Sequence, residues 1–76
     1  MISESDAKVF AWMDELCQEA RKDVSLMNHL SKASDAFPYY FNNVYALKAI
    51  SPDMFVTSGA MTEARRWYAE YIEGEE

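Results

Sequence analysis

The spacing of apolar residues in the first third of the chain is the feature that most restricts its fold. The apolar side chains recur at intervals of three and four residues: Val9, Trp12, Met13, Leu16 and Ala20. This spacing places them on one face of an α-helix, and polar side chains occupy the other face. Ser3 followed three residues later by Asp6 resembles a capping box. The sequence therefore predicts an amphipathic helix over residues 4–22.

The rest of the chain also reads as helical. The same periodicity and the usual capping residues predict further helices over residues 24–33, 38–50 and 60–73, with a short helical turn at 52–57. Asp23 and Ser51 suit N-cap positions, and Pro38 suits a first helical turn. The two glycines lie at a break and near the C-terminus, and nothing favours strands. We expect an all-α fold, a small single-domain bundle of four to five short helices over residues 1–76.

Chain length and residue counts limit how this bundle is stabilised. Seventy-six residues, half of them hydrophobic, predict one folded domain with a marginal core. Cys17 is the only cysteine and His29 the only histidine, which leaves no intrachain disulfide and no Cys–His metal site. We therefore expect no cofactor and no metal. Helix packing, self-association as a homodimer, or both must then stabilise the fold.

The balance of charge indicates a class of partner. Thirteen acidic residues against seven lysines and arginines give a net charge of −6. A negative surface repels phosphate backbones, so direct nucleic-acid binding is not expected, whereas a larger, basic protein is a suitable partner. No apolar run is long enough for a membrane span, and the N-terminus does not resemble a signal peptide. We expect a cytoplasmic protein that does not bind membranes.

No arrangement of residues indicates catalysis. His29 lies on the polar side of its helix, and Ser58-Gly59 lacks the upstream glycine of a nucleophile elbow. Paired carboxylates such as Asp14-Glu15 lie on a solvated helix face, where ordinary pKa values do no acid–base work at neutral pH. The sequence therefore predicts a protein that is not an enzyme.

The helix expected at 38–50 has two different faces. Tyr40 and Phe41 fall on its core side, whereas Tyr39, Asn42 and Asn43 form an outer surface without charge, bordered by Tyr45. Interface centres are rich in aromatic residues and poor in charge, so we expect these four residues to contact a partner protein. The alternative is a central helix that its neighbours cover on both sides.

Acidic residues along the first helix provide a second candidate surface. Asp14, Glu15 and Glu19 are predicted to steer the chain toward its partner. Carboxylates spaced along a helix can imitate phosphates, which suits a small acidic inhibitor that blocks a functional, nucleic-acid-binding surface of a larger protein. Phage-encoded anti-defence or host-takeover proteins act in this way. The alternative is an ordinary solvated polar face.

Two other functions remain open at this stage. Helices 24–33 and 38–50 could form a helix-turn-helix DNA-binding regulator, with Asn42 and Asn43 on adenine and Arg65-Arg66 on phosphate. The uncharged face could instead join two copies of the chain in a small assembly or adaptor protein. No motif ties the chain to a named family. Its resemblance to colicin immunity proteins extends only to size, acidity and helical character, so no residue role is carried over from them.

We also expect four side chains to build the centre of the core. They are Trp12, Leu16, Phe41 and Trp67.

Overall fold

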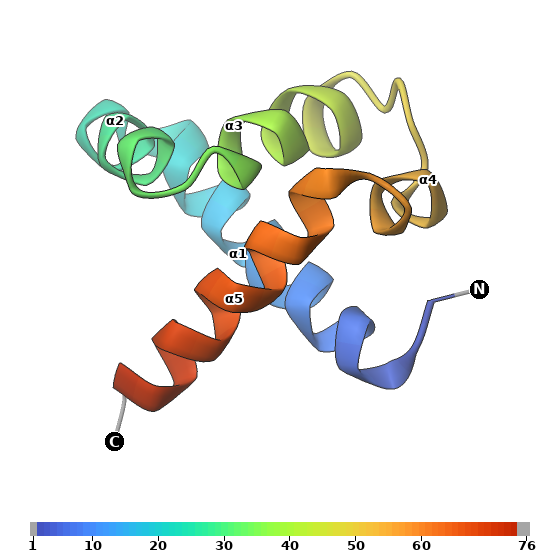
Figure 1. The fold of residues 1–76 in the computed structure, drawn as a ribbon. Coiled ribbons are helices and arrows are strands. Elements are labelled where there is room, and N and C mark those ends of the chain that lie inside the picture. Colours follow the sequence, from blue (N-terminus) through green and yellow to red (C-terminus); the bar gives the residue numbers. More distant parts are fainter. Residues whose placement is uncertain (1, 75–76) are drawn as a thin grey trace.

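The computed structural model describes residues 2–74, apart from the side chain of residue 73. Its elements, shown in Figure 1, are α1 (Glu4–Lys22), α2 (Val24–Ala33), α3 (Ala36–Tyr40), the π-helix η1 (Phe41–Ala46), α4 (Pro52–Val56) and α5 (Gly59–Gly74). Every regular element within residues 2–74 is a helix, which confirms the predicted small all-α bundle. None of these helices is both long and apolar enough to cross a membrane.

Side-chain caps fix where three of the helices begin. The Ser3 hydroxyl accepts a hydrogen bond from the backbone N–H of Asp6 at 3.1 Å. Asp23 accepts one from Leu26, and Ser51 accepts one from Met54, both at 3.2 Å. Each bond satisfies a backbone donor that has no partner within its own helix. The expected starts of α1, α2 and α4 therefore rest on the capping residues that the sequence indicated.

The helices pack in two layers. The molecule measures 33 × 33 × 18 Å, and the smallest dimension accommodates about two helix diameters. Figure 1 shows α5 crossing α1, with α3 and η1 along one side of this crossing and α4 next to the start of α5. The short α2 continues from the end of α1 and contacts α3. A domain this thin has a small interior, so few side chains can be covered on all sides.

Aromatic and sulfur-containing side chains fill the centre of the core. The largest fully buried side chains are Tyr40, Phe37, Phe55, Met13, Met61 and Cys17. Trp12 is also buried, at 9% exposure. The expectation for the other three residues is corrected, because Leu16, Phe41 and Trp67 are only partly buried and pack against the edge of this cluster. In a two-layer fold, residues on the flanks of an apolar stripe meet solvent on one side.

The third helix differs from its expected range of 38–50. It begins at Ala36, and from Phe41 it continues as a π-helix in which the backbone N–H of Leu47 donates to the carbonyl of Asn42 at 3.1 Å. Asparagine, valine and tyrosine are weak α-helix formers, so this stretch has little intrinsic preference for α geometry. The helix ends at Ala46 because the chain reverses at Lys48, whose φ is +53°.

Lys48 provides a first test of this geometry. A left-handed conformation costs a residue with a Cβ about 1–2 kcal/mol, and glycine avoids most of this cost. We expect Lys48→Gly to raise the free energy of unfolding by about 0.5–1 kcal/mol in urea denaturation. The matched control is Ala49→Gly, since Ala49 is also exposed and has no positive φ. That change should destabilise the protein, and a loss of stability in both variants would contradict the left-handed turn.

Candidate functional site

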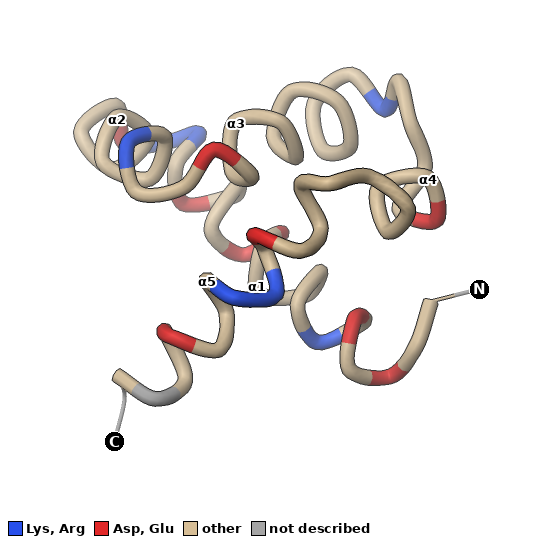
Figure 2. Tube along the Cα trace, viewed as in Figure 1, with Lys and Arg blue, Asp and Glu red and all other residues tan. Residues whose placement is uncertain are grey.

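The outer side of α3 and η1 is the first candidate surface. Tyr39 is 41% exposed, Asn42 is exposed and Asn43 is partly buried. We call these three residues the Tyr39 face. Figure 2 shows α3 and the helical turns that follow it in tan, and residues 36–46 contain no Asp, Glu, Lys or Arg. Because Tyr39 and Asn42 remain exposed, the helix is not buried on both sides, although α4 lies against part of the Tyr39 ring.

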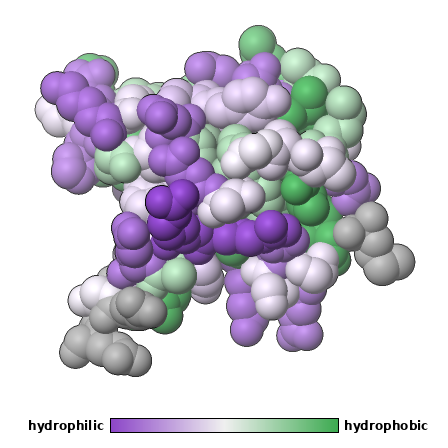
Figure 3. Space-filling model, in the orientation of Figure 1, coloured by the Kyte–Doolittle hydropathy of each residue, from purple (hydrophilic) through white to green (hydrophobic). Residues whose placement is uncertain are grey.

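Two contacts hold the Tyr39 face in place. The Tyr39 ring lies 5.7 Å from the ring of Phe55 on α4, centroid to centroid, and the side-chain amide of Asn43 donates to the Tyr39 carbonyl at 3.0 Å. Met54, next to Phe55 on α4, is 57% exposed. Figure 3 shows apolar residues gathered on the side of the molecule where α4 lies. Sequence reasoning missed Met54 because residues 54–56 were too few to classify.

Tyr45 does not belong to this face. Its ring packs on that of Phe41 at 5.6 Å, and it lies beside Gln18 and Arg21 of α1. Successive residues of a helix point in different directions, so Tyr45 turns toward α1 while Tyr39 turns toward α4. The structure therefore divides the four expected contact residues between two sides of the same segment.

The three acidic residues expected to act together are also divided. Asp14 is partly buried and accepts a hydrogen bond of 2.6 Å from the Tyr40 hydroxyl. Burial raises the pKa of Tyr40 above its ordinary value, and the hydrogen bond to the Asp14 carboxylate raises it further. Glu15 and Glu19, which are one helical turn apart, are both exposed on α1. The Asp14 carboxylate is thus hydrogen-bonded to a core residue. Of the three acidic residues, Glu15 and Glu19 are the ones that face solvent.

A groove lies between α1 and the chain that connects η1 to α4. It has a volume of about 920 Å³ and is open to solvent along one side. Its lining residues are Asp14, Gln18, Arg21, Tyr40, Phe41, Val44, Tyr45, Ala46, Lys48, Ile50, Ser51 and Pro52. The sequence did not reveal this groove, since residues 46–50 were expected to continue a helix. Ala46 and Ile50, which both fall within the expected helix 38–50, line the groove instead.

Side chains that often serve in catalysis are not brought together. Burial, followed by the charge of Asp14, raises the pKa of the Cys17 thiol to about 12, so this buried thiol is protonated and inert at neutral pH. His29 is exposed on α2. Across the described part of the chain, no three His, Cys, Asp or Glu side chains lie close enough to hold a metal ion.

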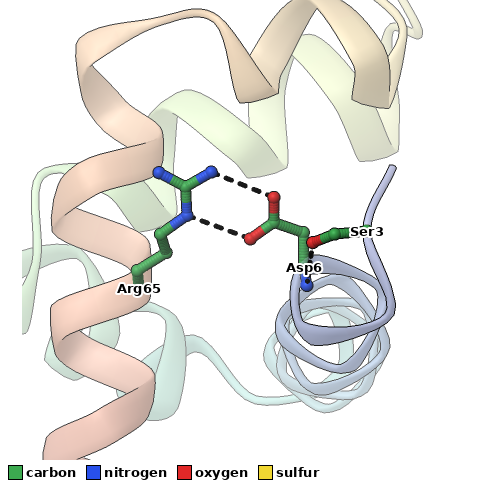
Figure 4. A network of polar contacts seen from close by, with 3 residues as sticks. All are labelled: Ser3, Asp6 and Arg65. Atoms are coloured by element: carbon green, nitrogen blue, oxygen red, sulfur yellow. Dashed lines mark hydrogen bonds and ion pairs between the residues drawn. The ribbon is translucent and has the colours of Figure 1, made fainter. Parts of the chain in front are cut away.

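Arg65 takes part in an ion pair that links the two ends of the fold. Its guanidinium donates two parallel hydrogen bonds of 2.9 Å to the carboxylate of Asp6, as Figure 4 shows. Asp6 is buried at 6% exposure, so it does not add to the exposed acidic residues of α1. Arg65 and Asn43 are thus both engaged within the chain, although the DNA-binding alternative needed them for phosphate and base.

We compared the chain with known proteins by sequence family, by similarity to curated proteins and by structure. No protein-family model, curated protein or solved structure gives a significant match.

Proposed function

We propose that this protein is a non-catalytic protein-binding module, a small acidic inhibitor that occupies a functional surface of a larger, basic protein. The observation that carries the proposal is the exposed Tyr39 face, which has no charge although the chain as a whole has a net charge of −6. An ordinary solvated helix presents glutamate and lysine on such a face. An uncharged, aromatic surface is typical of the centre of a protein interface.

The way Tyr39 is held supports its role as an anchor. Its ring rests against Phe55, which is fully buried, and its backbone carbonyl accepts the Asn43 amide. A side chain that is already fixed loses little conformational freedom when a partner binds. Tyrosine combines a large contact area with a polar hydroxyl, which suits it to an interface with an aqueous rim.

The charge distribution supports a basic partner. Glu15 and Glu19 are exposed on α1 and add to the overall negative potential. Such charges raise the rate of association with a positive surface and contribute less to the final affinity. In this proposal the protein acts in the cytoplasm, as phage-encoded anti-defence or host-takeover proteins do. It blocks a functional surface of its partner, for example a surface that binds nucleic acid.

Two alternatives are less well supported. A helix-turn-helix regulator needs several cations on its recognition helix, and residues 36–46 have none. Self-association through the Tyr39 face would give a homodimer. Light scattering at micromolar concentration distinguishes a dimer from a monomer, and a dimer that Tyr39→Ala dissociates would assign this face to self-association.

The main test is capture of the partner by the tagged protein from a lysate of its source, with and without nuclease. We expect the wild type to retain one protein after nuclease treatment, and Tyr39→Ala to weaken that complex at least roughly tenfold, as truncation of an interface anchor does. Tyr71→Ala is the matched control, because Tyr71 is 43% exposed on α5, away from the Tyr39 face.

The control variant should bind as the wild type does. In the purified complex, Glu15→Gln with Glu19→Gln should slow association more than it speeds dissociation. Direct recovery of nucleic acid, with binding that weakens strongly as salt increases, would reject the proposal in favour of a DNA-binding regulator.

A further inference from the structure

The groove between α1 and the η1–α4 connection is separate from the Tyr39 face. Its lining includes neither Tyr39, Asn42 nor Asn43. Its volume of about 920 Å³ lies within the range of sites that bind ligands. Phe41, Val44 and Ile50 give it an apolar base. A role for this groove therefore does not depend on the function proposed for the Tyr39 face.

The charges of the groove are the reverse of those of the whole protein. Two of its lining residues are cationic: Arg21 on α1 and Lys48 in the connection, both exposed. Its one acidic lining residue, Asp14, already accepts the Tyr40 hydroxyl hydrogen bond. On a chain with thirteen acidic residues and seven lysines and arginines, this is a local excess of positive charge over an apolar base. Such a surface attracts an anionic group that is attached to an apolar one.

The open shape favours a polypeptide over a small molecule. Sites for small molecules enclose most of the ligand surface, whereas this groove is open along one side and extends from α1 to the start of α4. An extended chain needs contact on one side only. The side-chain amide of Gln18 has both donors and an acceptor, so it can pair with a peptide backbone.

We propose that the groove between α1 and the η1–α4 connection binds an acidic peptide segment of another protein. A carboxylate of that segment lies between Arg21 and Lys48, and a neighbouring apolar side chain packs on Tyr45 and Ile50. The protein then has two separate binding surfaces. The Tyr39 face suits a basic partner, and the groove suits an acidic segment.

A titration of the ¹⁵N-labelled protein, followed by amide chemical shifts, tests this proposal. The probe is a capped pentapeptide with a central leucine flanked on each side by two glutamates. The matched probe carries lysine in place of each glutamate. We expect the acidic peptide to shift the amides of residues 44–50 in a saturable way at low salt, more weakly at high salt, and the lysine peptide to leave them unchanged.

Two pairs of substitutions separate the charge of the groove from the overall charge. Arg21→Gln with Lys48→Gln should weaken binding of the acidic peptide roughly tenfold. Lys8→Gln with Lys32→Gln removes the same charge from exposed positions outside the groove and should leave the affinity unchanged. Ala46→Trp, at an exposed lining position, should fill the groove and abolish binding while the spectrum of the folded protein is retained.

Each contrary result would overturn the proposal. These results are the absence of shifts at a peptide concentration of about 1 mM, equal binding of the lysine peptide, equal weakening by both pairs of substitutions, and shifts confined to the Tyr39 face.

Discussion

Replacement of Phe55 by alanine is expected to cost about 3–5 kcal/mol of unfolding free energy and to leave the protein only marginally stable at 25 °C. The Phe55 ring is fully buried and lies 5.8 Å from the Phe10 ring and 5.2 Å from the Tyr40 ring. A domain of this size has a total stability of about 5 kcal/mol. Loss of this one ring therefore removes most of the free energy that keeps the domain folded. Circular dichroism during urea denaturation measures the change.

Met54 provides the control for this experiment, since it precedes Phe55 on the same short helix and is 57% exposed. Met54→Ala should change the stability by no more than about 0.5 kcal/mol. A loss below about 1 kcal/mol in Phe55→Ala would show that α4 does not complete the core. Phe55 also supports the Tyr39 ring, so partner binding should fall together with stability in this variant.

The sequence predicts the long helices well because their signals are local. The apolar stripe of α1 is long enough to define a period, and the Ser3 and Asp23 caps mark where α1 and α2 begin. Both features depend on residues within a few positions of each other, so no knowledge of the tertiary structure is needed. The uncharged outer side of the third helix is also readable from spacing alone, but spacing left open whether neighbouring helices cover it.

Features that depend on distant residues could not be predicted. Phe55 belongs to a helix of five residues, too short to show a period, and its burial comes from rings on α1 and α3. Nothing local indicates that Asp14 accepts the hydroxyl of Tyr40, twenty-six positions away. Sequence spacing shows where the Asp14 side chain points but not that it meets Tyr40.

The π-helix also changes which residues line the groove. The sequence predicted that the third helix continues to residue 50. The wider hydrogen bonding of η1 and the left-handed turn at Lys48 instead end the helix at Ala46. This early end allows Lys48, Ile50 and Ser51 to line one wall of the groove. The groove therefore exists where the local sequence is a poor α-helix former.

The pair formed by Asp6 and Arg65 gives the second large effect. Its two parallel hydrogen bonds join α1 to α5, fifty-nine positions apart in the chain. Hydrogen bonds to charged groups are stronger than neutral ones, but the Arg65 side chain is 48% exposed and water screens it. We expect Asp6→Asn to lose about 1–2 kcal/mol of unfolding free energy at pH 7. Thermal denaturation of both proteins measures this difference.

The pH dependence of that loss distinguishes an ion pair from simple packing. The hydrogen bonds from Arg65 hold the pKa of Asp6 below its ordinary value of 3.8, although burial acts in the opposite direction. Above that value the carboxylate is ionised in both the folded and the unfolded protein, and the pair contributes fully. As the pH falls further, the unfolded chain takes up its proton first, so the contribution is lost as the pH passes through the lowered pKa of the folded state.

The stability difference between wild type and Asp6→Asn should therefore be constant from pH 7 to about pH 5 and shrink below about pH 4. Glu4→Gln removes an exposed carboxylate from the same helical turn and should show no such convergence. Arg65→Lys keeps the charge but cannot donate the two parallel hydrogen bonds. The stability of this variant should therefore lie between those of the wild type and Asp6→Asn. If the profiles of wild type and Asp6→Asn remain parallel down to pH 3, the carboxylate has an ordinary pKa. The link between α1 and α5 would then owe nothing to this charge.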